Sequence, residues 1–398
     1  MNFDRLKKLQ LSQPTKEDLQ LKSERRRHFF SLTHRYGLTG AIMAASGGLL
    51  LNENAAAQTA QQESELEKAA KHVITLGTAY RLEQQIGFPF AASETKFNLQ
   101  NITKGKVYVR IAAGGVLGGN TELAKKVQAN TIQLGQHSIS NLAPFAKEVD
   151  VINIPYWCAN NQQFTNLVTS KIWKDLVEKP AAANGYKVFC YLTIDPRTCS
   201  VSKKFDKPVR TPEDLKGIKF RVPGSKILAQ LYSLLGANPT PIAWGETAPA
   251  IKSGVADALD PSIAGLWIFG FGDILSWITR SSPVNDGNIL TMSKAWFDSL
   301  DKTTQQEVEY ASEITTRQQL ANVPSAREYA IASMAKAGVK FYVPTKAEQE
   351  AWVKAAGHQR KEWDSFKKEL TGSLQNFAKL EKAANTFSGF YVNDVKLG

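Results

Sequence analysis

From residue 72 onward, segments with the composition of β-strands alternate with segments that have helical periodicity. The first strand is expected over 72–79, and a helix over 85–99 leads to a second strand over 106–112, in which apolar and polar residues alternate. Further strands are expected over 132–136, 149–154, 186–192, 218–222 and 254–259, and further helices over 121–130, 162–177, 225–235 and 247–252. This alternation predicts an α/β protein with mostly parallel sheets.

The length of the chain predicts more than one folding unit. With 398 residues, the chain exceeds one typical domain and can bury two cores without disulfides or metal. We expect a first α/β lobe over 72–195, to which part of 286–330 returns, and a second α/β lobe over 196–285. The pattern from 296 to 398 is helical and predicts a region that braces both lobes.

The first 57 residues have the order of an export signal. A basic segment over 1–35 precedes a mild apolar run over 36–51, and small residues follow up to Ala57. The apolar run, about 16 residues, is short for a membrane span, which needs about 20. Within the basic segment, Arg26 and Arg27 followed by His28 resemble the twin-arginine motif. We therefore expect cleavage after Ala57 and export to the periplasm, by the twin-arginine (Tat) route.

The formal net charge of +12 leaves several kinds of partner open. A basic chain can bind nucleic acid or anionic lipid, but no Lys/Arg block is longer than Arg25–Arg27, so a nucleic-acid partner is not expected. A diffuse positive field that attracts small anions and a role in solubility alone remain equal interpretations.

The cysteines and histidines do not form a metal-binding or catalytic pattern. Cys158, Cys190 and Cys199 have no CxxC spacing, and at most one disulfide can form, with Cys190 and Cys199 the closer pair in sequence. No HExxH and no GxSxG motif occurs. His137 fits a polar residue at a strand end better than a catalytic base. No catalytic residue, no metal site and no cofactor are expected.

A glycine-rich loop over 114–120, with the sequence GGVLGGN, lies between a strand and a helix. Phosphate groups bind in such places, but the loop matches neither GxGxxG nor GxxxxGK[ST]. We interpret it as a tight turn before a helix that is capped by Asn120 or Thr121.

The segment over 212–261 carries a family resemblance. Its sequence, PEDLKGIKFRVPGSKILAQLYSLLGANPTPIAWGETAPAIKSGVADALDP, resembles the substrate receptors of tripartite ATP-independent periplasmic (TRAP) transporters, the DctP-like family. The segments GGVLGGNTELAKKVQAN, VDVINIPYW and MSKAWFDSL are also similar to that family, and the resemblance covers nearly all of 72–330. It implies a two-lobed α/β fold like that of periplasmic binding proteins, with a ligand cleft between the lobes and bracing C-terminal helices.

The same resemblance implies a function. Members of the family are receptors rather than enzymes. They bind a small organic acid and deliver it to an integral-membrane TRAP permease. The alternative that we keep open is a Tat-exported hydrolytic enzyme that acts on a substrate with a carboxylate group. A third interpretation, a basic protein that binds polyanionic surfaces, predicts salt-sensitive binding.

Arg221 is the strongest candidate for ligand binding. In the predicted strand over 218–222, Phe220 and Val222 share one face, so Arg221 points to the other face, at the carboxyl end of the strand. Ligands bind at that edge of open α/β sheets, and a guanidinium can grip a carboxylate with two parallel hydrogen bonds. Arg221 also occupies the position of the family's signature arginine, and Arg197 matches a second family arginine near the ligand carboxylate.

Four further residues are ligand-binding candidates by position in the family pattern. Trp244 and Glu246 correspond to the wall of the pocket, although core packing for Trp244 and helix capping for Glu246 are rival interpretations. Ser138 and Asn141 lie in a loop that supplies hydrogen bonds in relatives, but Ser and Asn are also ordinary turn residues.

One departure from the family pattern concerns ligand choice. Where many dicarboxylate receptors read DGxENP, this chain reads DALDP over 257–261 and lacks the asparagine. Asp260 is expected to orient Arg221 or to accept a hydrogen bond from the ligand. A C4-dicarboxylate is therefore doubtful, and the nearby Trp267 and Phe269 favour a monocarboxylate with an apolar or aromatic body.

Overall fold

The computed structural model describes residues 53–80, 82, 91–321, 323–390 and 392. Residues 1–68 and 69–398 form two separate compact units. The described part of the first unit belongs to helix α2 (Glu53–Ala69), whose last residue is the first residue of the second unit. The predicted twin-arginine sequence and apolar run lie outside the described residues. None of the described helices combines the length and the apolar composition that a membrane crossing requires.

The first sheet of the second unit has the strand order β2-β1-β3-β10-β4. Its strands are β1 (His72–Thr78), β2 (Val107–Ala112), β3 (Leu134–Ser138), β4 (Tyr186–Pro196) and β10 (Asn285–Ser293). β1 runs parallel to β2 and β3, and helices α3 (Ala91–Ile102) and α4 (Asn120–Gln128) make the crossovers. β10 is antiparallel to both β3 and β4. Apolar residues of this sheet pack with α3 and α13 (Lys302–Ala321) into one core.

The second sheet has the order β11-β9-β5-β8-β6-β7. Its strands are β5 (Cys199–Ser202), β6 (Lys219–Val222), β7 (Asn238–Pro241), β8 (Ala258–Leu259), β9 (Leu275–Thr279) and β11 (Lys340–Tyr342). β6 is parallel to β7 and β8, whereas β5 is antiparallel to β8 and β9. Helices α9 (Lys226–Leu234), α10 (Trp244–Lys252) and α11 (Ile263–Ile268) belong to this half.

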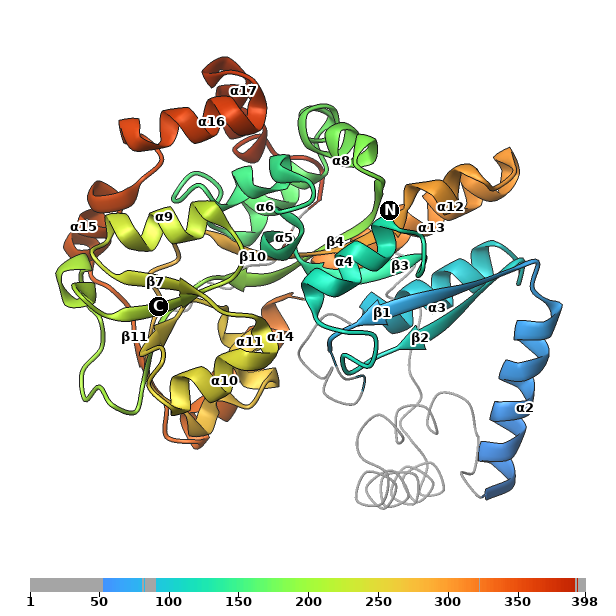
Figure 1. Ribbon diagram of the computed structural model, residues 1–398, viewed down its shortest axis with the longest axis horizontal. Helices are drawn as coiled ribbons and strands as arrows, with labels where there is room; N and C mark the ends of the chain where they lie inside the picture. The colour runs from blue at the N-terminus through green and yellow to red at the C-terminus, as the bar shows by residue number, and fades with distance from the viewer. Residues whose placement is uncertain (1–52, 81, 83–90, 322, 391, 393–398) are drawn as a thin grey trace, which may run out of the picture. The chain divides into compact units, whose positions relative to one another are not determined.

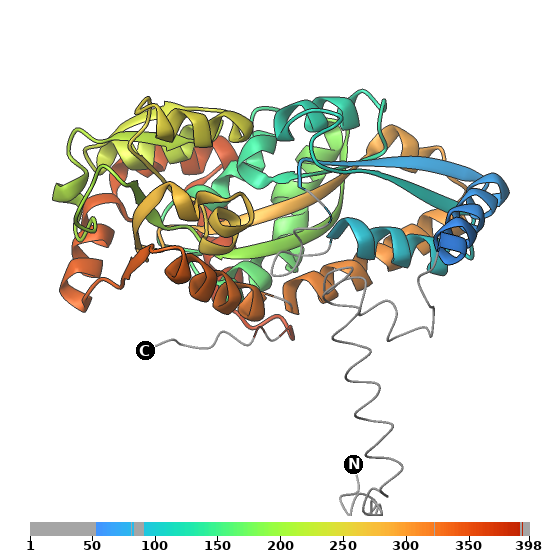
Figure 2. The same cartoon turned by 90° about the horizontal axis from the view of Figure 1, so that it is seen from below.

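Two connections carry the chain between the sheets. β4 leads directly into β5, and β9 leads back into β10, so the long strands β4 and β10 of the first sheet continue toward the second (Figures 1 and 2). The backbone N–H of Arg197, in the first connection, donates to the carbonyl of Val284 in the other, over 2.8 Å. The two connections are therefore joined to each other where they cross.

The remaining helices cover both sheets. α13 packs against α3 and β4, α14 (Val323–Lys336) against α11 and β4, and α15 (Lys346–Ala356) against α9. α17 (Leu374–Ala384) packs against α6 (Asn161–Val168), and α16 (Asp364–Thr371) against η3 (Lys147–Asn153). The short elements are α5 (Ile139–Leu142), α7 (Lys171–Trp173), η4 (Lys174–Glu178), α8 (Lys179–Ala183), η5 (Pro212–Leu215), η6 (Phe271–Asp273), α12 (Lys294–Asp298) and η7 (Lys361–Trp363).

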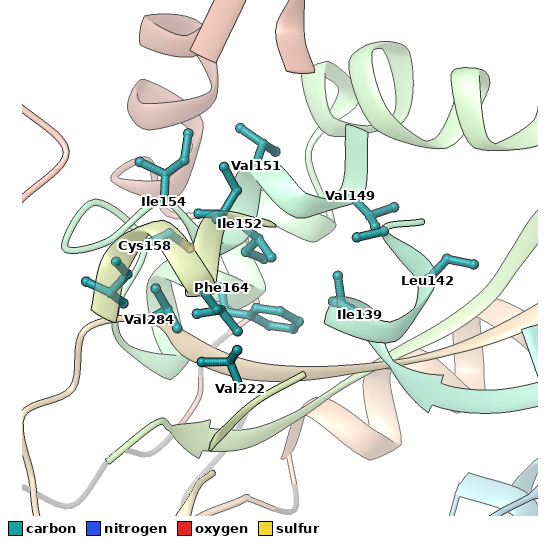
Figure 3. Close-up of a cluster of buried hydrophobic side chains, with 14 of the residues drawn as sticks. Ile139, Leu142, Val149, Val151, Ile152, Ile154, Cys158, Phe164, Val222 and Val284 are labelled. Atoms are coloured by element: carbon teal, nitrogen blue, oxygen red, sulfur yellow. The ribbon is translucent and has the colours of Figure 1, made fainter. Parts of the chain in front are cut away.

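The predicted strand over 149–154 is wrong, because this segment belongs to the 3₁₀-helix η3 and the residues that follow it. Its apolar side chains are buried, and Figure 3 shows them in one cluster with Phe164 and Val222. A short apolar run is compatible with a buried strand and with a buried helical turn, so its pattern does not distinguish them. The cluster joins residues of the segment between β3 and β4 of the first sheet to β6 of the second sheet.

Three other predictions also need correction. The sheets are mixed rather than mostly parallel, since β5 and β10 are antiparallel to their neighbours. The helix expected over 162–177 is divided into α6, α7 and the π-helical turn η4. Gly119, rather than Asn120 or Thr121, is the N-cap of α4, and its N–H donates to the Glu122 carboxylate over 2.9 Å.

The three cysteines are free and buried. Burial raises the pKa of each thiol, so none of them is a thiolate at neutral pH. The pair Cys190 and Cys199 is not bridged in this structure.

Candidate ligand-binding site

A cavity lies between the two sheets, at the end where β3 and β6 finish. It holds about 440 Å³ of space free of protein atoms, which includes some open solvent. The first sheet and its loops, the crossing strands and the second half of the chain all contribute side chains. The lining residues are Tyr80, Asn120, Ser138, Asn141, Ile194, Arg197, Arg221, Pro223, Trp244, Pro261, Gly265, Phe269, Asp286 and Asn288.

Arg221 lies in β6 and reaches this cavity, as its strand phase predicts. Its side chain is buried, and both Nε and Nη2 donate to the carbonyl of Ile242, over 3.0 and 2.8 Å. The guanidinium also lies over the Trp244 ring, 5.2 Å from its centroid. Of five guanidinium hydrogens, those on Nη1 and one on Nη2 remain for a ligand.

No carboxylate among the described residues lies within ion-pair distance of Arg221. Burial lowers the pKa of Arg221 to about 10, which still leaves the side chain charged at neutral pH. The cavity therefore contains a buried guanidinium group with a positive charge. The edge of this group that carries Nη1 and Nη2 matches the geometry of a carboxylate.

Arg197 also lines the cavity, but it already has anionic partners. Nη1 is 3.0 Å from an oxygen of Asp260, and Nη2 is 2.8 Å from an oxygen of Asp286. Nη2 also donates to the Ser140 hydroxyl over 3.3 Å, while Nε is buried without a partner. Burial alone would lower the pKa of Arg197, but the charges of Asp260 and Asp286 outweigh it and raise that pKa.

Asp260 lies behind the cavity wall rather than in it. Its carboxylate is completely buried and pairs with Arg197, not with Arg221. Its Oδ2 atom has no hydrogen-bond partner among the described residues. Of the two roles predicted for Asp260, neither is seen directly, because the structure assigns this carboxylate to the other arginine.

Aromatic side chains form one wall of the cavity. Trp244 packs edge-on against Phe269, with ring centroids 4.9 Å apart, and stacks on Phe271 at 5.4 Å. The Tyr80 ring also lies edge-on to Phe269, with ring centroids 5.5 Å apart. Trp244 therefore lines the cavity and also packs on Phe271, so the two rival positions, pocket wall and core packing, are both occupied by this side chain.

The polar part of the lining comes mainly from the first half of the chain. Ser138, at the end of β3, and Asn141, in α5, line the cavity as predicted. Asn120 lines it as well, and neither Oγ of Ser138 nor Oδ1 of Asn120, both buried, has a hydrogen-bond partner among the described residues. Glu246, in contrast, is exposed in the first turn of α10 and is not among the lining residues.

Four polar lining residues had no place in the sequence-based prediction of the site. Asp286 and Asn288 lie on one face of β10, a strand that the pattern did not predict. The Tyr80 hydroxyl donates to Asn288 over 2.9 Å, and Tyr80 follows β1 by two residues. Asn120 was interpreted as a possible helix cap. Tyr80 directly follows the predicted strand over 72–79, and this position at a strand end is the signal that could have found it.

A metal-binding cluster does not emerge from the part of the chain that the structure describes. No group of three His, Cys, Asp or Glu side chains there is placed to hold a metal ion. His137 is buried in β3, and its Nε2 lies 2.9 Å from the Thr291 hydroxyl. Burial lowers its pKa to about 3, so the ring is neutral.

Comparison with solved structures identifies the fold. The sugar acid binding protein DctPAm from Advenella mimigardefordensis, solved with galactonate, superposes with a TM-score of 0.72 at 19% identity, over 80% of this chain and 99% of that one. A TRAP periplasmic solute binding protein from Sulfurospirillum deleyianum, solved with succinate, gives a TM-score of 0.69 at 19% identity, over 80% and 100% of the two chains. These similarities confirm the predicted two-lobed α/β fold.

Sequence comparison identifies the family. The 2,3-diketo-L-gulonate-binding periplasmic protein YiaO of Escherichia coli is 25% identical over 297 residues, which are 72% of this chain and 88% of that protein. The family model described as bacterial extracellular solute-binding protein, family 7 (DctP) matches residues 90–368. This chain therefore belongs to the DctP family of extracellular solute-binding proteins, the periplasmic receptors of TRAP transporters.

Proposed function

We propose that this chain captures a small organic acid in the cavity between its two sheets and delivers it to an integral-membrane TRAP permease. It acts as a receptor and not as an enzyme. The similar proteins named above bind 2,3-diketo-L-gulonate, galactonate and succinate, all of which are small organic acids, and this supports the ligand class.

The observation that carries the proposal is the environment of Arg221. Its buried guanidinium has no carboxylate partner among the described residues, and burying an unpaired charge costs free energy. A bound anion would supply the missing partner. Arg221 lines a cavity that Ser138, at the end of β3, and Asn141, in α5, also line. A carboxylate on Arg221 would contact side chains from both halves of the chain at once.

Capture then works by closure of two lobes. We take 72–195, with part of 286–330, as the first lobe and 196–285 as the second, with the helices after 296 bracing both. The connections between β4 and β5 and between β9 and β10 act as the hinge. An acid that contacts both walls favours the closed state by its differential affinity for it, and the permease recognises that state.

Export precedes capture. The order of basic, apolar and small residues over 1–57 supports removal of this segment, and the pair Arg26 and Arg27 supports the Tat route. Replacing both arginines by lysine should retain the chain in the cytoplasm, which fractionation of expressing cells measures. Export of the variant at the normal rate would exclude the Tat route.

A thermal-shift screen of organic acids tests the receptor function. We expect at least one carboxylate to raise the melting temperature of the exported protein by several degrees, without being consumed. The shift should disappear in Arg221→Ala and persist in Arg317→Ala, which removes an exposed arginine of α13 outside the cavity. Turnover of the bound acid would favour the hydrolytic enzyme instead.

A further inference from the structure

We infer that Asp260 and Asp286 form a charge filter that admits one ligand carboxylate and rejects a second, so that the receptor selects hydroxylated monocarboxylates over the corresponding dicarboxylates. This inference rests on the proposed function, because it concerns the ligand held by Arg221. It begins from the charges that surround the cavity.

Two arginines and two aspartates lie at the cavity or directly behind its wall. Arg197 and Arg221 are the cations among the described lining residues. Asp286 lines the cavity, and Asp260 lies directly behind Arg197. These four side chains are two cations and two anions, and Arg221 has no anionic side chain within ion-pair distance among the described residues, whereas Arg197 has two.

Both aspartates are fixed in place. Asp286 Oδ1 contacts Arg197, and its Oδ2 accepts hydrogen bonds from the backbone N–H and the hydroxyl of Ser262, each over 3.0 Å. Asp260 is held by Arg197 and by complete burial. Either carboxylate would have to give up its own ion pair with Arg197 to turn away from an incoming anion.

The first ligand carboxylate has a partner, but a second has none. Once Arg221 has bound a carboxylate, the cavity carries a net negative charge, and Arg197 remains occupied by Asp260 and Asp286. A second carboxylate would be buried against two like charges without a free cation, which is unfavourable even where the site is partly solvated.

The neutral groups of the lining favour hydroxyls instead. Asn120 Oδ1 is buried without a hydrogen-bond partner among the described residues, and it is an acceptor, so a ligand hydroxyl can donate to it, whereas an ionised carboxylate cannot. The Ser138 hydroxyl, which also has no partner there, can either accept from a ligand hydroxyl or donate to an oxygen of the ligand. The aromatic wall of Trp244 and Phe269 lies beside Arg221 and can pack against the carbon chain of the ligand. The ligand class that satisfies all three features is an aldonate-like hydroxy acid.

Calorimetric titration with matched acids tests the filter. Aldonates of four, five and six carbons and the aldarates with the same carbon skeletons differ only in whether the far end is a hydroxymethyl or a carboxylate. We expect the exported protein to bind at least one aldonate at least tenfold more tightly than its aldarate. Equal or tighter binding of the aldarate would overturn the filter, and so would a lack of binding by every aldonate.

Two variants place the selectivity on the aspartates. Asp286→Asn and Asp260→Asn each remove one negative charge and loosen Arg197, so the aldonate preference should fall at least tenfold in either. Asp257→Asn is the matched control, because Asp257 is also buried but pairs with Lys204 outside the cavity. An unchanged preference for the aldonate in a folded Asp286→Asn or Asp260→Asn protein would overturn the assignment of the selectivity to these aspartates. If neither variant folds, the ratio of aldonate to aldarate affinity in the wild-type protein tests the filter.

Failure of the filter and failure of the receptor proposal give different results. If an aldarate binds as well as its aldonate, and both lose binding in Arg221→Ala, then the filter is wrong and the receptor proposal stands. If the tightest acid binds Arg221→Ala as well as wild type, then the proposed role of Arg221 itself is wrong.

Discussion

His137 connects a single buried side chain to the pH dependence of folding. Its pKa in the folded protein, about 3, lies below the ordinary value of 6.5 because the ring is buried. Below pH 6.5, His137 therefore binds a proton in the unfolded chain but stays neutral in the folded chain. The contribution of neutral His137 to the free energy of unfolding is complete above pH 6.5. It is lost as the pH falls toward 3, by at most about 1.4 kcal/mol per pH unit.

Urea unfolding between pH 4 and 7 measures this contribution. We expect the free energy of unfolding to fall less steeply with decreasing pH in His137→Gln than in wild type. The difference in slope should be at most the value for uptake of one proton on unfolding. Parallel pH profiles for the two proteins would contradict the buried, neutral state of His137.

Gly287 is required by close packing at the centre of β10. A Cβ atom at this position would lie 2.6 Å from Phe164 and 2.7 Å from Ile139. We expect Gly287→Ala to lower the free energy of unfolding by about 1–3 kcal/mol, as overpacking does. Gly245→Ala is the control, since nothing lies within 4 Å of its added Cβ, and it should be neutral or slightly stabilising. Equal stability of the two variants would contradict the packing described here.

At the level of residues, the sequence pattern located the cations of the site better than its anions. Arg221 follows from the phase of one short strand, and the structure places it in the cavity. Asp286 and Asn288 lie in a segment whose polar residues and glycine do not resemble a buried strand. Their burial depends on partners far along the chain, such as Arg197 and Tyr80, which no local pattern contains.

Helix α14 is tied to strand β4 by a buried ion pair. Arg327 Nη1 lies 2.7 Å from Asp195 Oδ1, and both side chains are buried. Asp195 has a positive φ of 95°, close to the point where β4 leaves the first sheet. Asn161 donates to the same oxygen over 2.9 Å. This pair joins a C-terminal helix to the proposed hinge.

Removal of Arg327 should therefore be costly. Arg327→Met leaves the Asp195 carboxylate buried beside an apolar side chain, and we expect a loss of about 3 kcal/mol in the free energy of unfolding. The double variant Arg327→Met with Asp195→Asn should recover part of that loss, because no unpaired charge remains. Urea unfolding of the four proteins in this cycle measures the coupling, and strictly additive effects would exclude it.

At the level of elements, long periodic segments were predicted well and short ones were not. β1, β2, β4, β6, α4 and α9 lie close to their predicted positions. The apolar run over 149–154 was predicted as a strand but lies mostly in the 3₁₀-helix η3. A run that is buried on all sides has the same apolar composition in a strand and in a helical turn, so the sequence did not distinguish them. β5 and β9 are short, and the backbone hydrogen bonds that define them come from strands distant in sequence.

For the whole molecule, the account predicts a change of shape on ligand binding. An acid that contacts Arg221 and the loop with Ser138 should favour the closed arrangement of the lobes. Small-angle X-ray scattering should therefore show a smaller radius of gyration when the tightest acid is added to wild type. No change is expected in Arg221→Ala at the same ligand concentration, and compaction of both proteins alike would contradict closure through this residue.

The two-lobed architecture was the part of the fold that the sequence predicted most fully. Alternating strands and helices predicted the α/β class, and the family pattern around Arg221 predicted the order of its elements. The direction of β5 and β10 relative to their neighbours was not predicted, because it depends on how the chain crosses between the sheets. That crossing also brings Asp286 to Arg197, so the same long-range geometry determines the charge balance of the site.

A crystal structure of the exported protein with its tightest-binding acid tests the central claim most directly. The account predicts one ligand carboxylate within hydrogen-bond distance of Nη1 and Nη2 of Arg221, with Arg197 still paired to Asp260 and Asp286. A carboxylate bound elsewhere, with Arg221 contacting only Ile242 and Trp244, would contradict it.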